Sequence, residues 1–164
     1  MTLIKSISGI RGTIGGQVGD NLTPIDAVKF ASAYGVWLKE NREKEKYKVV
    51  VGRDARISGK MMQNLVMNTL IGLGIDVVDV GLSTTPTVEV AVTLEHADGG
   101  IILTASHNPK QWNALKLLNE KGEFLDAVEG AKILDIAESD TINFADVDNL
   151  GKIIKNKAYI DLHI

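Results

Sequence analysis

The spacing of apolar residues predicts a long amphipathic helix near the start of the chain. From Val28 to Leu38, apolar side chains recur every three or four positions, which places them on one face of a helix. Thr23 can cap the free amide groups of the first turn, and Pro24 suits the first helical position. The charged run 39–48 is then expected to be the solvent-exposed exit of this helix.

Three further helices are expected from start and stop signals. Ser58 can cap a second helix, which Gly74 would end, and its methionines Met61 and Met62 are expected to fill the core. Thr85-Pro86 opens a third helix that runs toward His96, with Gly99-Gly100 as its break. A fourth starts at Asp126, with Glu129 three residues later, and ends near Ser139.

Short runs of β-branched and other apolar residues alternate with these helices. They predict buried strands, of which the third and fourth are joined by a reversal at Asn108-Pro109: 49–51, 76–80, 101–103 and 114–118. Alternating strands and helices predict an α/β fold, a three-layer α/β/α unit with a mixed, mostly parallel sheet and one hairpin at its edge. The loops of Arg53, Ser83 and Ser106 then share the rim where the strands end.

Composition narrows the classes of function. The chain has 164 residues, a formal charge of −3 and no cysteine, so disulfides and thiolate metal sites are excluded. The weak negative charge provides no cationic field, which argues against nucleic acid and anionic membranes as partners. The apolar runs fall far short of the roughly 20 residues of a membrane span, and no signal peptide is visible. We therefore expect a cytoplasmic protein.

Reactive side chains concentrate in the segment Thr104 to Pro109. Ser106 could be a nucleophile, but the side chain of the adjacent His107 would diverge from it in an extended segment, which disfavours a hydrolase pair. Phosphoryl transfer fits better, because a serine oxygen can hold the group while nearby cations neutralise its charge. Lys116 stands in an apolar strand, where partial desolvation suits it to proton transfer; the alternative is an exposed lysine on an edge strand.

Two other basic segments are candidates for anion binding. Arg11 lies between glycines, in Gly9 to Gly12, which let backbone and guanidinium approach an anion closely; the alternative is a flexible turn. In the segment 53–56, Asp54 is expected to pair with an arginine or a loop amide beneath the site. His96 and His163 are interpreted as capping or surface residues.

These segments together resemble the α-D-phosphohexomutase superfamily, which includes phosphoglucomutase/phosphomannomutase and phosphoglucosamine mutase. The resemblance rests on four segments that occur in the family's order: Gly9-Ile10-Arg11-Gly12, Gly52-Arg53-Asp54-Ala55-Arg56, Thr104-Ala105-Ser106-His107-Asn108-Pro109 and Asn113-Ala114-Leu115-Lys116. It implies an enzyme that interconverts sugar 1-phosphates and 6-phosphates through a bisphosphate intermediate. Ala114 departs from the glycine that many relatives carry.

The resemblance also implies roles for single residues. Ser106 would be the phosphorylated residue, Lys116 the general acid/base, Arg11 an active-site arginine, and His107 a helper in proton handling or orientation. The family binds Mg²⁺ through the phosphoserine and three aspartates of a D-x-D-x-D loop in a second domain. This sequence lacks that loop, so Ser106 is the only metal ligand expected here.

The resemblance is to the first of four domains. We expect residues 1–150 to form the phosphoserine domain and 151–164 to begin the linker to an absent second domain. The expected partners are a hexose phosphate and the remaining domains, without which the fragment would be inactive. An alternative from another class is a catalytically silent module that binds phosphate or carbohydrate, since a fold does not guarantee a function.

Overall fold

The computed structural model describes residues 1–7, 9–139 and 141–159. These residues form a seven-stranded sheet whose strands lie in the order β1-β2-β6-β5-β3-β4-β7. The strands are β1 (Ile4–Ser6), β2 (Gly9–Thr13), β3 (Tyr47–Arg53), β4 (Ile75–Leu82), β5 (Gly99–Leu103), β6 (Trp112–Leu118) and β7 (Ile153–Lys155). All run in one direction except β1 and β6, so the expected mixed, mostly parallel sheet is confirmed.

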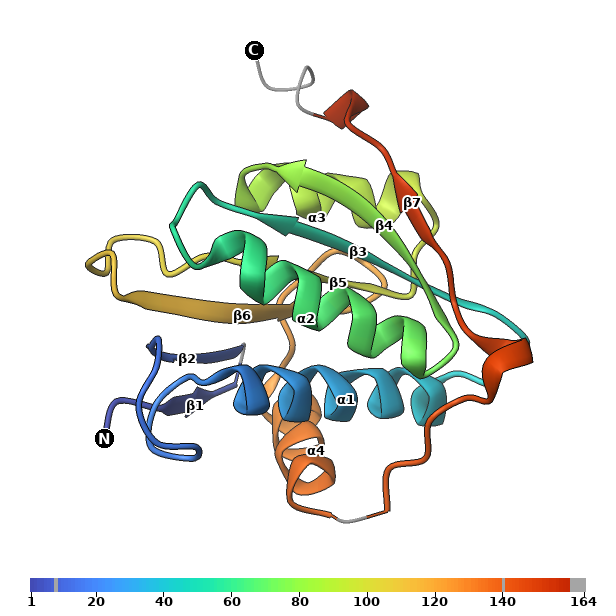
Figure 1. The fold of residues 1–164 in the computed structure, drawn as a ribbon. Coiled ribbons are helices and arrows are strands. Elements are labelled where there is room, and N and C mark those ends of the chain that lie inside the picture. The colour runs from blue at the N-terminus through green and yellow to red at the C-terminus, as the bar shows by residue number, and fades with distance from the viewer. Residues whose placement is uncertain (8, 140, 160–164) are drawn as a thin grey trace.

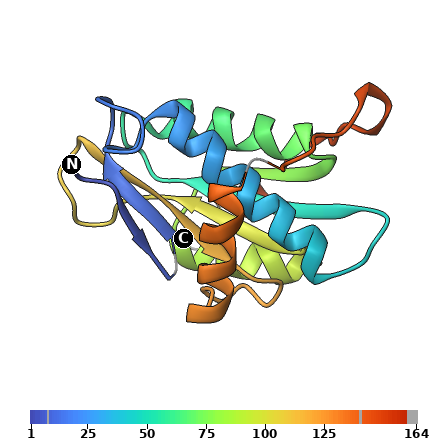
Figure 2. The ribbon, with the colours of Figure 1, turned by 90° about the horizontal axis from the view of Figure 1, so that it is seen from below.

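Helices cover both faces of this sheet. They are α1 (Pro24–Asn41), α2 (Gly59–Gly72), α3 (Thr85–Leu94) and α4 (Ala127–Glu138), with a short 3₁₀ turn at Val147–Asn149. Figure 1 shows α3 on one face and α1 with α2 on the other. Seen from below in Figure 2, α4 crosses α1 on its outer side. The predicted α/β/α layering is confirmed, and α4 adds to the α1 layer.

The helix starts follow the local sequence signals. Thr23 accepts a hydrogen bond from the amide of Asp26, whose carboxylate in turn accepts from the Thr23 amide at 3.1 Å. Asp126 and Glu129 form the same reciprocal pair at the start of α4. Each pair satisfies two amide groups that have no partner within the helix, so these predictions are confirmed.

The expectation of a single buried face on α1 is incomplete. Residues on several sides of the helix are buried, including Ala27, Phe30, Ser32 and Trp37. The reason is that α1 packs against α2 on one side and α4 on another, in addition to the sheet. A helix with three neighbours buries most of its circumference, whatever the width of its apolar stripe.

Two expectations for α2 are wrong. Ser58 precedes the helix in a helical conformation and makes no capping hydrogen bond; its hydroxyl instead accepts from the side-chain amide of Asn113 at 2.8 Å. Met61 does not fill the core, because 40% of it is exposed, whereas Met62 is fully buried. Met61 precedes Met62 in the sequence, but it lies on the side of α2 that faces solvent. Gly74, with a positive φ of 82°, follows the end of the helix as predicted.

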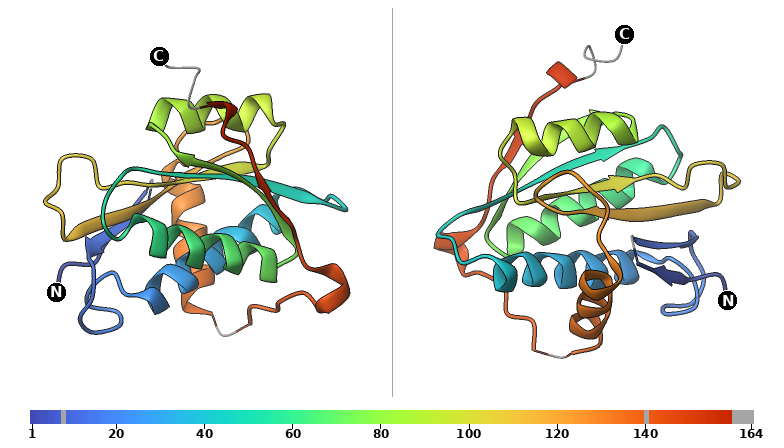
Figure 3. Two further views of the ribbon diagram at one scale, coloured as in Figure 1. Left: turned by 45° about the horizontal axis from the view of Figure 1, so that its top comes forward. Right: turned by 180° about the vertical axis from the view of Figure 1, so that it is seen from behind.

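The glycine-rich amino terminus forms strands that the sequence pattern did not reveal. β2 pairs antiparallel with β6, and β1 pairs antiparallel with β2. The hairpin of β5 and β6 therefore lies inside the sheet, so the prediction that it forms an edge is wrong. Figure 3 shows the opposite edge, where β7 runs beside β4.

Gly99 and Gly100 also differ from expectation, because they open β5 and do not break α3, which ends at Leu94. A Cβ on Gly99 would overlap the Tyr34 hydroxyl, and one on Gly100 would meet Val92 at 2.7 Å. Glycine is required here because a helix side chain reaches the strand backbone from each face.

The sheet continues past residue 150, where the expected linker begins. Ile153–Lys155 pairs in parallel with β4, and Tyr159 is buried with the residues beneath α3. The division at residue 150 stays a prediction, and His163 lies outside the described residues. Among the described helices, none combines the length and apolar character that crossing a membrane requires.

Candidate active site

The loops after β3, β4 and β5 meet at one rim of the sheet, as the sequence predicts. The amide of Asp54 donates to the carbonyl of Leu103 at 3.0 Å, and that of Ser83 donates to the carbonyl of Arg53 at 2.9 Å. The first bond links the loop after β3 to the end of β5, and the second links the loop after β4 to the end of β3. The segment from Ala105 onward leaves the sheet at this rim and returns as β6.

Ser106 has an unusual backbone conformation. Its φ of 52° lies in the left-handed region, which costs a residue with a Cβ about 1–2 kcal/mol. The conformation is held from both sides, since the Ser106 amide donates to the Thr104 hydroxyl at 3.1 Å and the Ser106 carbonyl accepts from Arg56 at 2.9 Å. Strained backbone of this kind concentrates at functional sites. The premise that this segment is extended was wrong.

The hydroxyl of Ser106 is paired with Lys116. The Lys116 ammonium nitrogen, Nζ, donates a hydrogen bond to Ser106 Oγ at 2.9 Å, across ten residues of sequence. Lys116 is half-buried on β6, a strand between two others, so the alternative of an exposed edge-strand lysine is wrong. The hairpin brings the two groups together, because β6 runs back along β5 past the loop that carries Ser106.

Strand alternation decides which face of the sheet carries these cations. Leu115 and Leu117 on β6 join the core beneath α1 and α2, so Lys116 between them points to the other face. On that face α3 packs over β3 and β5. The part of the face over β2 and β6 is thus left for the side chains of Lys116 and its neighbours.

Arg11 comes to the same place from the other end of the chain. In the antiparallel ladder of β2 with β6, Arg11 is the direct partner of Ala114, two residues from Lys116 on the same face. Gly9, two positions before Arg11, also has a structural purpose within the sheet. A Cβ on Gly9 would lie 2.2 Å from the Leu115 carbonyl oxygen, so glycine permits the close approach of β2 to β6.

The sequence-predicted residues line one cavity of about 310 Å³. Its lining is Arg11, Ala105, Ser106, His107, Asn108, Ala114 and Lys116. Arg11 and His107 are exposed at its surface. The lining contains an arginine, a lysine and a histidine but no carboxylate, so its electrostatic potential favours an anion. The arrangement therefore joins a hydroxyl, a proton donor and a positive field within one small space.

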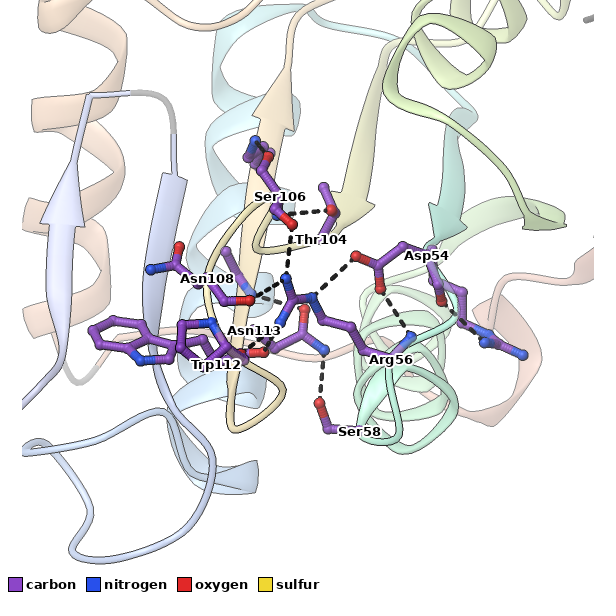
Figure 4. Close-up of polar contacts among 12 residues, drawn as sticks. Asp54, Arg56, Ser58, Thr104, Ser106, Asn108, Trp112 and Asn113 are labelled. Carbon is purple, nitrogen blue, oxygen red and sulfur yellow. Dashed lines mark hydrogen bonds and ion pairs between the residues drawn. The ribbon is translucent and has the colours of Figure 1, made fainter.

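Arg56 lies next to this cavity, and the sequence assigned it no role of its own. Figure 4 shows its guanidinium between Asp54 and the loop that carries Ser106 and Asn108. Asp54 accepts from Arg56 Nε at 3.2 Å and from the Arg56 amide at 3.1 Å, which confirms the expected pairing of Asp54. The segment 53–56 contains two arginines, Arg53 and Arg56. Only the fold shows that Arg56 is the one that reaches the loop of Ser106.

Metal ligation by this chain alone is not supported. Across the described parts of the chain, no three His, Cys, Asp or Glu side chains gather around a common point. Asp54, a carboxylate beside the cavity, is held by Arg56. Among Arg11, Ser106, His107 and Lys116, the residues predicted to form the site, only the side chain of Ser106 carries an oxygen.

Comparison with known proteins identifies the family to which this fold belongs. Residues 3–143 match the family model described as phosphoglucomutase/phosphomannomutase, alpha/beta/alpha domain I. The chain belongs to the phosphoglucomutase/phosphomannomutase family. The match covers every helix of the sheet's two faces and the loop of Ser106, which confirms the resemblance drawn from the sequence.

Relatives from archaea and bacteria show the same likeness. The chain is 38% identical over 156 residues to a phosphoglucomutase/phosphomannomutase of Thermococcus kodakarensis, with 92% of this chain and 34% of the relative covered. It is 37% identical over 149 residues to a phosphoglucosamine mutase of Lactobacillus acidophilus, covering 88% and 32%. The chain thus spans about a third of the length of these curated relatives.

A solved structure supports the fold. The crystal structure of a phosphoglucomutase/phosphomannomutase family protein from Burkholderia thailandensis superposes with a TM-score of 0.75 at 25% identity, covering 93% of this chain and 32% of that one. The family's names describe isomerases of hexose phosphates, and this chain corresponds to their first domain.

Proposed function

We propose that Ser106 carries a phosphoryl group and exchanges it with a hexose phosphate, so that sugar 1-phosphate and 6-phosphate interconvert through a bisphosphate. The observation that carries this proposal is the hydrogen bond from Lys116 Nζ to Ser106 Oγ inside a cavity lined by cations. A serine oxygen in such a field can hold a phosphoryl group, whose negative charge the cations offset.

The transfer balances with the groups that surround Ser106. The bond between phosphorus and Ser106 Oγ breaks while a hydroxyl oxygen of the sugar monophosphate forms a new bond to phosphorus. That hydroxyl releases its proton to the surrounding water, and Ser106 Oγ gains one from Lys116 Nζ. Lys116 touches Ser106 Oγ, so it can deliver the proton in this direction and take it back when the bisphosphate returns its other phosphoryl group to the serine.

Arg11 and His107 have supporting parts in this proposal. Arg11 is exposed at the mouth of the cavity, where its guanidinium can bind phosphate oxygens with two parallel hydrogen bonds. His107 follows Ser106 directly and lines the same cavity, so it can orient the phosphoryl group or pass a proton. Both contacts would form only when a substrate is bound.

The proposal includes a magnesium ion that this chain holds only in part. A phosphorylated Ser106 would give it one oxygen, and the remaining ligands would come from acidic residues outside this chain. When bound, Mg²⁺ would neutralise charge on the transferred phosphoryl group. Because these ligands and most of the sugar contacts would lie in further domains, we expect residues 1–164 alone to show little turnover.

The test uses the full-length protein that contains this sequence. Purified protein is incubated with glucose 1,6-bisphosphate and Mg²⁺, and phosphopeptides are identified by mass spectrometry. We expect phosphate on Ser106, and we expect Ser106→Ala to lose both this phosphate and the conversion of glucose 1-phosphate to glucose 6-phosphate. Ser139→Ala, a change at an exposed serine after α4, is the matched control and should keep both activities.

Two outcomes would contradict the proposal. Full mutase activity of Ser106→Ala would show that another group carries the phosphoryl transfer. Binding of hexose phosphate without phosphorylation or turnover would show a silent binding module. A panel of glucose, mannose and glucosamine phosphates on the same protein then identifies the hexose.

A further inference from the structure

Arg56 makes several polar contacts with the loop that carries Ser106, residues 104–112, although no signal in the sequence indicates them. At distances of 2.7 to 3.1 Å, its two Nη atoms donate to four backbone carbonyl groups, those of Ser106, Asn108, Pro109 and Trp112. Its Nε donates to Asp54 at 3.2 Å. One side chain from the loop between β3 and α2 thus contacts both ends of the loop between β5 and β6.

These contacts use the whole hydrogen-bonding capacity of the guanidinium. An arginine has five N–H donors. In Arg56, Nε makes one hydrogen bond and each Nη atom makes two. The side chain is only 12% exposed. Arg56 therefore has no donor left for a phosphate, unlike Arg11, which is exposed at the cavity.

We propose that Arg56 is the positioning residue of the Ser106 loop, which keeps Ser106 Oγ against Lys116 without binding substrate itself. The loop needs such a residue for two reasons. Its carbonyl groups converge on one point, where they repel each other unless a donor lies between them. Ser106 is also in a left-handed conformation, which the chain would leave if its carbonyl lost its partner.

Lysine cannot replace Arg56 in this role. An ammonium group has three donors around one atom, whereas the four carbonyls and Asp54 are reached by a planar fork with donors on three nitrogens. Asp54 completes the arrangement, because its carboxylate accepts from both the side chain and the amide of Arg56. The pair thereby orients the guanidinium toward the loop.

A first test of the loop does not depend on any activity. Amide hydrogen exchange of residues 104–112 is measured in the full-length protein and in Arg56→Ala and Arg56→Lys. We expect exchange in this loop to rise by about tenfold or more in both variants, while the strands β3 and β5 stay protected. Unchanged exchange of the loop would overturn the proposal.

The second test rests on the proposed function and separates positioning from substrate binding. We expect Arg56→Lys to lower kcat for glucose 1-phosphate by about 100-fold, because a misplacement of about 1 Å has that effect, and to change KM less than threefold. Added guanidinium ion should restore part of the kcat of Arg56→Ala. A raised KM with an unchanged kcat would show that Arg56 binds substrate, and would overturn the proposal.

Two controls keep the result decisive. If Arg56→Ala does not fold, Arg56→Lys and Asp54→Asn carry the test, and Asp54→Asn should show a smaller loss of kcat because it keeps an acceptor for the Arg56 amide. If Ser106→Ala retains full mutase activity, the proposed function fails, whereas the exchange of residues 104–112 still decides the role of Arg56.

Discussion

Arg11 lies directly opposite Ala114 in the ladder between β2 and β6, on the face of the sheet that carries Lys116. Cross-strand partners point to the same side, so a residue near the amino terminus is brought to the cavity of Ser106. The small side chain of Ala114 leaves the space between the two cations open. Ala114 is therefore compatible with this site.

The position of Arg11 predicts a role in substrate affinity. Arg11→Gln removes its charge, and a charge-assisted hydrogen bond contributes about 1.5–3 kcal/mol. We expect the KM for glucose 1-phosphate to rise by about 10- to 100-fold in the full-length protein. The melting temperature should not change, because Arg11 is exposed. Arg11→Lys is the control that keeps the charge and should lose less. A KM within twofold of the parent would contradict the role.

Lys116 is expected to act in the chemical step. Lys116→Met keeps the length and apolar character of the side chain but removes the proton donor to Ser106 Oγ. We expect kcat to fall by about 10²- to 10⁴-fold, the usual contribution of a positioned acid or base. Phosphorylation of Ser106 from glucose 1,6-bisphosphate, followed by mass spectrometry, should slow in parallel. An unchanged kcat would assign Lys116 a structural role only.

Gly9 should be sensitive to the smallest possible substitution. The Cβ of Gly9→Ala would lie 2.2 Å from the Leu115 carbonyl oxygen, so β2 must move away from β6. We expect the free energy of unfolding to fall by about 1–3 kcal/mol in urea titrations followed by circular dichroism.

The matched control for Gly9 is Gly72→Ala at the end of α2, where the nearest atom to the new Cβ is an edge carbon of Phe144 at 3.5 Å. It should raise the free energy of unfolding by about 0.4–1 kcal/mol. Equal effects of the two substitutions would contradict the crowding at Gly9.

Tyr34 should make the fold sensitive to alkaline pH. Burial raises the pKa of its phenol far above the ordinary value, and its hydroxyl donates to the carbonyls of Leu118 and Gly100. Because the pKa of Tyr34 is higher in the folded state, the neutral phenol stabilises the fold. This stabilisation is fully present below the unfolded-state pKa of about 10 and is lost as pH rises above that value.

Tyr34→Phe separates these two effects. At neutral pH we expect the free energy of unfolding to fall by about 1–3 kcal/mol, since two buried carbonyls lose their donor. Between about pH 9 and pH 11 the variant should lose less stability than the parent, because it has no phenol to ionise at this position. Parallel curves for the two proteins over this range would refute the assignment to Tyr34.

Local signals predicted the helices well. The start of α1 at Thr23 and of α4 at Asp126 depends on hydrogen bonds between residues three positions apart, and such contacts can be recognised in any sequence. Ser58 shows the limit of this reasoning. It has the residue type of a cap, but its hydroxyl accepts from Asn113, which is 55 positions away.

The short strands at both edges could not be predicted in this way. β1, β2 and β7 have no clear apolar alternation. They form because a neighbouring strand offers its backbone: β6 to β2, β2 to β1, and β4 to β7. Gly9 gave no sign of its role, since glycine suits both a turn and a close approach of strands.

The sequence by itself determined the helices, the main strands and the serine motif, because these depend on periodicity and on contacts within a few residues. Only the tertiary structure decided that Arg11 and Lys116 meet at Ser106 and that Arg56 holds the loop. The physical reason is that strand pairing and side-chain packing join distant segments. Their register follows from the total burial and hydrogen bonding of the sheet, which no single segment encodes.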